Sequence, residues 1–165
     1  VPEGNIVGEV PSGMGVIVQA YSLFDIFENT IEGNETINIA IVTYPYETED
    51  KTYNPHPRNV QIYNNTFGKS GYRPDLETGE LAKMLFELSG GDMPDIFWDG
   101  VVPLSSLLSS KVKKEAIILG NNKDATFLTI NPIKFMLPFF DPVVRDYDWF
   151  RGEIKPLAEV KISDK

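Results

Sequence analysis

Apolar and polar residues alternate in several short runs of this chain, and related runs recur further along. In the first run, Val16, Val18 and Ala20 fall on one face of an extended backbone, because alternate residues of a strand point the same way. The short length and β-branched content of these runs predict strands rather than helices. Asparagine follows three of the runs, in FDIFENTI (24–31), VQIYNNTF (60–67) and IILGNN (117–122).

Two offsets relate the first two copies of this pattern. Val16 matches Ile39, 23 residues later (39 − 16), and Ile26 matches Ile62, 36 residues later (62 − 26). The difference of 13 residues equals the length of the segment 45–57, which we interpret as a loop inserted into the second copy. The spacing therefore predicts a repeat of about 23 residues.

The third copy follows the second by 57 residues at two separate positions, Ile39 with Ile96 (96 − 39) and Ile62 with Leu119 (119 − 62). A repeat with two or three short strands cannot bury its own apolar face, whereas stacked repeats can. The pattern therefore predicts an all-β fold. We expect a right-handed parallel β-helix, a solenoid of about three coils, with one short helical insertion and a C-terminal cap.

The recurring asparagines have a structural interpretation in such a stack. Asn29, Asn65 and Asn122 occupy the matched position, and Asn64 and Asn121 extend two of the copies. Asparagine tolerates the left-handed backbone region that tight corners use. Its amide also hydrogen-bonds to an equivalent asparagine in a neighbouring layer. We therefore predict a structural asparagine ladder, with a catalytic or binding role as the alternative.

Three insertions interrupt the repeats, and a segment of different character follows them. We expect coils over 1–128, with insertions at 43–58, 69–94 and 100–115, and a C-terminal cap or flank-packing tail over 129–165. The insertion 69–94 predicts a short helix ended by two glycines, with an apolar face formed by Leu81, Met84, Leu85 and Leu88.

The insertions 43–58 and 100–115 have equal length and matching offsets, so we expect them to lie side by side. Their charges are partly complementary: Glu47, Glu49 and Asp50 in the first, and Lys111, Lys113 and Lys114 in the second. The first is rich in aromatic residues, namely Tyr44, Tyr46, Tyr53 and His56. Such side chains on a loop suit sugar stacking or a protein contact. The alternative is a local cluster folded down over the loop.

Charge and composition exclude several classes of protein. The formal net charge is −9 (15 − 24), which disfavours nucleic acid as a partner. The absence of cysteine removes disulfides and thiolate sites, and the single histidine, His56, rules out metal sites built from several imidazoles. No apolar run is long enough to span a membrane. No signal peptide is present. The first residues enter a coil directly, without a cap comparable to the C-terminal one, so we expect the C-terminal portion of a longer β-helix.

Three carboxylates around one predicted strand are the candidates for chemistry. Asp92, Asp95 and Asp99 lie close in sequence, and Asp95 and Asp99 share one face of an extended backbone. They supply oxygen ligands of the kind that Ca²⁺ takes, and a pair of acids of the kind that inverting glycoside hydrolases need. No other cofactor is predicted. Solvated acids at a strand end are the simpler interpretation.

The repeats resemble a known family. The segments SGMGVIVQAYSLFDIFENTIEGNETINIAIVTY, PHPRNVQIYNNTF and MPDIFWDG are similar to the parallel β-helix repeat proteins of bacterial envelopes, over roughly residues 4–128. The resemblance is to an exported or lipoprotein group of unknown function within the pectate-lyase-like superfold. It implies a location in the periplasm, on the outer membrane as a lipoprotein, or outside the cell. It also implies an envelope partner of c-type-cytochrome character, and it carries over no catalytic residue.

Two functions follow as hypotheses. The leading one is a non-catalytic envelope scaffold or binding module that contacts a protein or glycan partner through the loops at one corner of the solenoid. The alternative is a carbohydrate-active enzyme, a polysaccharide lyase or glycoside hydrolase, or an inactive relative of one. A groove with converging carboxylates would favour the enzyme. A broad apolar or aromatic contact surface would favour the binding module.

Overall fold

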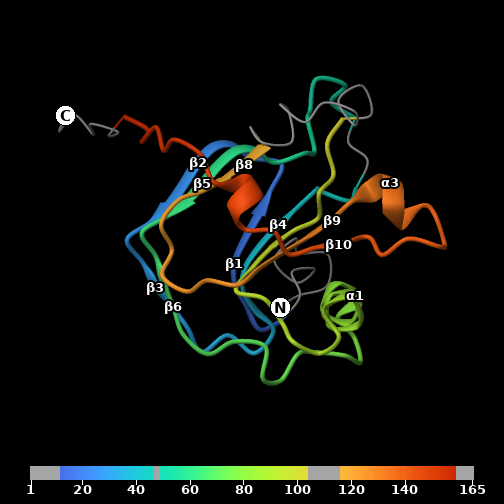
Figure 1. The fold of residues 1–165 in the computed structure, drawn as a ribbon. Coiled ribbons are helices and arrows are strands. Elements are labelled where there is room, and N and C mark those ends of the chain that lie inside the picture. The colour runs from blue at the N-terminus through green and yellow to red at the C-terminus, as the bar shows by residue number, and fades with distance from the viewer. Residues whose placement is uncertain (1–11, 47–48, 104–115, 159–165) are drawn as a thin grey trace.

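The computed structural model describes residues 12–46, 49–103 and 116–158, whose strands form three open sheets (Figure 1). The five-stranded sheet has the order β1-β4-β7-β9-β10. Its strands are β1 Met14–Gln19, β4 Ile37–Val42, β7 Ile96–Trp98, β9 Phe127–Ile130 and β10 Val143–Val144. The three-stranded sheet joins β2 Ser22–Phe27, β5 Arg58–Tyr63 and β8 Ile117–Leu119, and the two-stranded sheet joins β3 Thr30–Ile31 and β6 Thr66–Phe67.

The strands pair in the registers that the sequence offsets predict. Val16 lies opposite Ile39 in the parallel pair β1 and β4, and Ile26 lies opposite Ile62 in β2 and β5. The offset of 57 residues is confirmed by the pairs Ile39 with Ile96 and Ile62 with Leu119. Equivalent apolar side chains therefore stack on the same face of each sheet.

The predicted fold class is nevertheless wrong. The sheets have five, three and two strands and none is closed, so the structure does not show a right-handed parallel β-helix. One sheet is mixed, because β10 runs antiparallel to β9. The described residues also include helices α1 Glu80–Ser89 and α3 Pro132–Phe135 and the 3-10 helix η3 Asp148–Phe150. Repeat offsets determine which strands pair, but they do not determine whether the sheets close around an axis.

The inner strands β4, β7 and β9 of the five-stranded sheet are buried on both faces. All six residues of β4 are buried, which explains why five of them are apolar and do not alternate with polar ones. The exception, Asn38, donates from its side chain to Gly68 O and to Asp95 Oδ1. Ile39 and Ile41 belong to an inner cluster that the sheets share, with Ile62 and Trp98. The opposite face carries an outer cluster formed by Ile37, Ala40, Val42, Leu85, Phe97, Leu128 and Ile130.

Helix α1 covers this outer cluster (Figure 1). Leu85 is fully buried against the sheet, and Leu81 and Met84 pack beside it. The helix ends at Gly90, which takes the left-handed backbone (φ +68°). The N–H of Gly90 then donates to Glu87 O (3.2 Å), and the N–H of Gly91 donates to Phe86 O (2.9 Å). The helix expected in the insertion 69–94 is therefore present, and one of its faces helps to form the candidate site.

The C-terminal segment packs against both larger sheets. Phe150 of η3 is buried, with its ring centroid 5.6 Å from that of Trp98 and 5.0 Å from that of Phe127. Further on, Lys155 N donates to Gln61 Oε1 (2.7 Å) and Gln61 Nε2 donates to Lys155 O (2.8 Å). Within 129–158 the chain thus covers the core at η3 and lies along β5.

Candidate functional site

The loop 43–57 is tied down at its base by Asp99, which follows β7. The Asp99 carboxylate accepts hydrogen bonds from the backbone N–H of Thr43 (2.6 Å) and of Val101 (3.0 Å). Thr43 Oγ1 lies 3.2 Å from His56 Nδ1, and Tyr44 N donates to Pro55 O (3.0 Å). Both ends of the loop are therefore held together beside one carboxylate.

Burial changes the acidity of both groups at the loop base. It raises the pKa of the Asp99 carboxyl, and the backbone N–H groups of Thr43 and Val101 partly offset this effect. Burial lowers the pKa of His56, although the nearby Asp99 charge acts in the opposite direction. Burial at the loop base thus disfavours the charged form of both groups, most directly the imidazolium of His56.

The tyrosines of this loop form a local cluster and also remain accessible. The ring centroid of Tyr44 lies 5.4 Å from that of Tyr46 and 5.8 Å from that of Tyr53, both edge to face. Tyr46 is 52% exposed. The rings therefore pack against one another as the alternative of a local cluster expects, and Tyr44 and Tyr46 also line a cavity. Contact with a sugar or a protein stays a prediction.

A cavity of about 800 Å³ lies beside the loop. Its apolar lining comes from the five-stranded sheet, α1 and the α3 region, through Ile17, Val42, Leu81, Met84, Ile130, Pro132 and Phe135. Tyr44, Pro45 and Tyr46 contribute from the loop. Among the described residues, its charged lining is entirely acidic: Asp75, Glu80 and Asp99. The cavity is thus apolar in its body, aromatic at one side and negative in charge.

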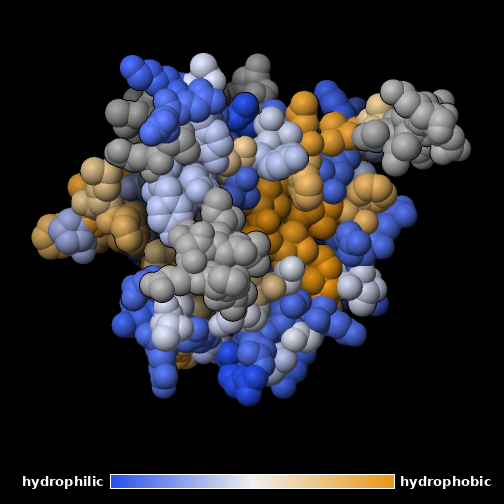
Figure 2. All heavy atoms as spheres, turned by 180° about the vertical axis from the view of Figure 1, so that it is seen from behind, coloured by the Kyte–Doolittle hydropathy of each residue, from blue (hydrophilic) through white to orange (hydrophobic). Residues whose placement is uncertain are grey.

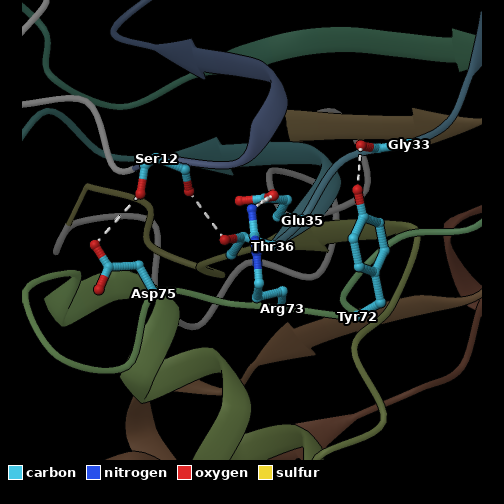
Figure 3. A network of polar contacts seen from close by, with 7 residues as sticks. All are labelled: Ser12, Gly33, Glu35, Thr36, Tyr72, Arg73 and Asp75. Atoms are coloured by element: carbon cyan, nitrogen blue, oxygen red, sulfur yellow. Dashed lines mark hydrogen bonds and ion pairs between the residues drawn. The ribbon is translucent and has the colours of Figure 1, made fainter.

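Asp75 is fixed at the cavity wall by hydroxyl and backbone donors. Ser12 Oγ donates to its carboxylate at 3.3 Å, and the backbone N–H of Thr78 donates at 3.0 Å. Hydrogen bonds from Thr78 lower the pKa of Asp75 to about 2. Figure 3 shows Ser12 between Asp75 and Thr36, with the Arg73–Glu35 ion pair nearby. Asp75 therefore carries its charge at any neutral pH.

The three predicted carboxylates do not converge. Asp95 and Asp99 flank β7 at its two ends, so a rise of about 3.3 Å per residue places their Cα atoms about 13 Å apart. Asp95 accepts from Asn38 Nδ2 (3.0 Å) and Thr126 Oγ1 (2.8 Å), and Asp92 is exposed. The described part of the chain contains no group of three side chains suited to a metal ion. Of these three carboxylates, only Asp99 lines the cavity.

Sequence reasoning did not connect Asp99 with the tyrosine loop, although the signal was present. The offset of 57 residues places Asp99 opposite Val42, the last residue of β4, since Ile41 pairs with Trp98. The chain enters the loop at Thr43, so the register alone brings Asp99 to the loop base. The expected neighbour 100–115 lies outside the described residues from 104 onward, as do Glu47, Lys111, Lys113 and Lys114.

Three asparagines form a chain of hydrogen bonds, in which Asn65 and Asn122 are buried and Asn29 is exposed. Asn29 Nδ2 donates to Asn65 Oδ1 (3.2 Å), and Asn65 Nδ2 donates to Asn122 Oδ1 (3.0 Å). Asn122 Nδ2 then donates to Tyr147 Oη (2.8 Å), and that hydroxyl donates to Gly120 O (2.9 Å). Because these amides bond to one another and to the backbone, the structure gives them a supporting role.

Asn64 and Asn121 do not belong to this chain of side-chain bonds. Asn64 takes the left-handed backbone (φ +56°), as Glu28 does in the preceding copy. Its N–H donates to Asn121 O at 2.6 Å. The two predicted uses of asparagine are therefore divided between neighbouring residues: Asn64 forms the turn, and Asn65 forms the ladder.

The segment 133–140 is the accessible surface that sequence reasoning missed. Six of its eight residues are large, apolar and exposed: Ile133, Phe135, Met136, Leu137, Phe139 and Phe140. Phe139 is 93% exposed and Met136 is 81% exposed. The segment includes the end of α3 and the loop that projects from it before β10 in Figure 1, and it appears as hydrophobic atoms at the left edge of Figure 2. The cluster FMLPFF (135–140) is visible in the sequence, where its composition predicts a cap that packs on the core rather than an exposed surface.

Comparisons with family models, curated proteins and solved structures find no match to this chain. In the described part of the structure, no helix combines the length and apolarity needed to cross a membrane. The site must therefore be interpreted from its own geometry.

Proposed function

We propose that this protein is a non-catalytic binding module that docks a protein partner through segment 133–140 and the adjoining cavity. The observation that carries the proposal is the run of six exposed, large apolar side chains within eight residues. Scattered exposed apolar residues are ordinary on protein surfaces, whereas contiguous ones mark contact sites. Phenylalanine and methionine are also enriched where proteins meet.

The segment is held in place from both ends. Asn131 Oδ1 accepts from the N–H of Ile133 (3.1 Å) and Lys134 (3.2 Å), which caps α3. At the other end, Asp141 Oδ1 accepts from Val143 N (2.9 Å), where β10 begins. A segment anchored in this way loses little conformational entropy when a partner binds.

The apolar surface continues into the cavity. Phe135 is exposed on the segment and also lines the cavity, as does Pro132 at the start of α3. A protein partner can therefore cover the segment and insert a few residues into the cavity at the same time. The acidic lining and the net charge of −9 favour a partner that is apolar at its centre and basic at its rim.

The proposal keeps two expectations that rest on resemblance alone. The partner is an envelope protein, and a c-type-cytochrome character is the form suggested for it. A glycan remains the second ligand class, because Tyr44 and Tyr46 offer aromatic rings at the cavity, with Tyr53 packed against Tyr44. The enzyme alternative loses the support of Asp92, Asp95 and Asp99, which lie apart.

The test is photo-crosslinking followed by binding measurements. A photoreactive phenylalanine analogue replaces Phe139 in one variant and Tyr72, which is exposed elsewhere, in a control variant. We expect position 139 to trap one defined protein of the source cells and position 72 not to do so. With that partner purified, Phe139→Ser should weaken binding about 10-fold or more, because the lost burial of a large apolar side chain costs about 1.5–3 kcal/mol.

Two outcomes would overturn the proposal. The first is equal affinity of the partner for the parent chain and for Phe139→Ser, with Leu23→Ser as the matched exposed control. The second is binding of the parent chain to phosphatidylcholine vesicles that the same substitution abolishes, which would assign the segment to a lipid surface instead.

A further inference from the structure

We infer that the cavity recognises a short apolar peptide segment carrying one basic side chain, lysine or arginine, which pairs with Asp99. The inference rests on the proposed function only in naming a protein as the source of that segment. The chemistry of the cavity carries the rest and can be tested separately.

The size and lining of the cavity define the body of the ligand. A volume of about 800 Å³ accommodates a drug-sized molecule, which corresponds to a few residues rather than one side chain. Ile17, Val42 and Ile130 line it from the five-stranded sheet, and Leu81 and Met84 line it from α1. These aliphatic groups stabilise apolar side chains and the methylene stems of lysine or arginine, whereas sugar hydroxyls would lose hydrogen bonds against them.

The charges define the polar part of the ligand. The charged lining residues among those described are Asp75, Glu80 and Asp99, and no lysine or arginine of the described chain lines the cavity. An acidic ligand would therefore bring a like charge into a partly enclosed apolar space. Glu80 also stands in the first turn of α1, where it offsets the partial positive charge of the helix start. A cation is the complementary group.

Asp99 is the carboxylate best placed to receive this cation. Its two oxygens are fixed by Thr43 N and Val101 N, so its position does not depend on a flexible side-chain rotamer. Each carboxylate oxygen has two acceptor sites, so capacity remains after these bonds. Tyr44 and Tyr46 line the same cavity, and an aromatic face attracts a cation. Carboxylate and rings thus act on the same incoming group.

The test uses three acetylated, amidated tripeptides that differ only at the central residue: Leu-Lys-Leu, Leu-norleucine-Leu and Leu-Glu-Leu. They are titrated into the full chain carrying ¹³C-methyl methionine, which provides four reporters. Met84 lines the cavity, Met136 lies in segment 133–140, and Met14 and Met93 pack elsewhere against the outer cluster. We expect the lysine peptide to shift Met84 selectively and to bind at least about 10-fold more tightly than the other two.

Matched variants separate charge from structure. Asp99→Asn should remove the preference for lysine over norleucine, whereas Asp124→Asn, the same change outside the cavity, should retain it. If Asp99→Asn does not fold, the salt dependence of binding to the parent chain decides the question. The affinity of the lysine peptide should fall as the salt concentration rises, and that of the norleucine peptide should not.

Equal binding of all three peptides, or a lysine preference that survives Asp99→Asn, overturns the inference. So does a lysine peptide that shifts Met136 and leaves Met84 unchanged. These failures leave the proposed docking through Phe139 standing, because that proposal depends on the purified partner and not on the peptides.

Discussion

The side-chain amide of Asn65 donates a 3.0 Å hydrogen bond to Oδ1 of Asn122, 57 residues further along the chain. The Asn65 amide also donates to the carbonyls of Ile26 (2.9 Å) and Tyr63 (3.1 Å), and the whole side chain is 1% exposed. One buried amide therefore connects all three copies of the repeat.

Replacing this amide should destabilise the fold strongly. Asn65→Ala leaves buried backbone carbonyls and the N–H of Asn29 without their partner, so we expect a loss of about 2–4 kcal/mol in the free energy of unfolding. Urea denaturation measures it. Asn64→Gly is the control, since glycine accepts the left-handed backbone of that residue, and the change should stay within about 1 kcal/mol. A loss below about 0.5 kcal/mol for Asn65→Ala would contradict the ladder's role.

Gly100 should tolerate no side chain. Its φ is +70°, and a Cβ at this position would lie 1.8 Å from Ile130 O, so Gly100→Ala must displace β9 or the loop base. We expect at least about 3 kcal/mol of destabilisation, measured as a fall in melting temperature. Gly33→Ala provides the comparison, because φ is +75° there but no atom lies within 4 Å. The free energy of unfolding of that variant should fall by only about 1–2 kcal/mol, the cost of placing an alanine in the left-handed region. Similar losses in the two variants would refute the steric argument.

His56 should titrate below pH 6.5, because burial disfavours its charged form. A depressed pKa in the folded state means that His56 contributes stability above its unfolded pKa of 6.5, and this contribution is lost as pH falls through the folded pKa. NMR measures this directly, since the chain has one histidine.

The same titration tests the coupling between His56 and Asp99. The Asp99 charge raises the pKa of His56, so Asp99→Asn should lower it further. Asp124→Asn is the matched control and should leave it unchanged. A His56 pKa at or above 6.5, or one that is unchanged by Asp99→Asn, would show that the loop base is arranged differently in solution.

Tyr147 should stabilise the end of the ladder through its hydroxyl. Tyr147→Phe removes the acceptor for Asn122 Nδ2 and the donor to Gly120 O, with an expected cost of about 1–2 kcal/mol in chemical denaturation. Tyr72→Phe removes an exposed hydroxyl that donates to Gly33 O (2.9 Å), and it should cost less than about 0.5 kcal/mol. If the two substitutions lower the free energy of unfolding by similar amounts, the Tyr147 hydroxyl does not stabilise the end of the ladder.

Strand pairing could be predicted from the sequence because it depends on local, repeated features. Alternation of apolar residues gives the face of each strand, and the match of Val16 to Ile39 gives its partner. Closure of the sheets depends on the angles between elements, which no offset encodes. The antiparallel return of β10 at Val143 is an example, since two valines carry no signal of direction.

The candidate site was predictable only in part, for a similar reason. Tyr44 and Asp99 each stood out as residues able to bind a ligand, and the register of β4 with β7 places them together. The exposure of Phe139 depends instead on what packs over it, and an apolar run has the same composition in a core and on a contact surface.

Strands β1, β2 and β3 are each the outermost strand of their sheet, and within the described residues each pairs along one side only. Unpaired strand edges are templates for other strands, and the face seen in Figure 2 adds a hydrophobic area to this risk. The net charge of −9 keeps copies apart, but it vanishes near pH 4.6, and salt screens it. Resistance to aggregation thus depends on electrostatic repulsion between copies. The protein should therefore aggregate in mild acid or in concentrated salt.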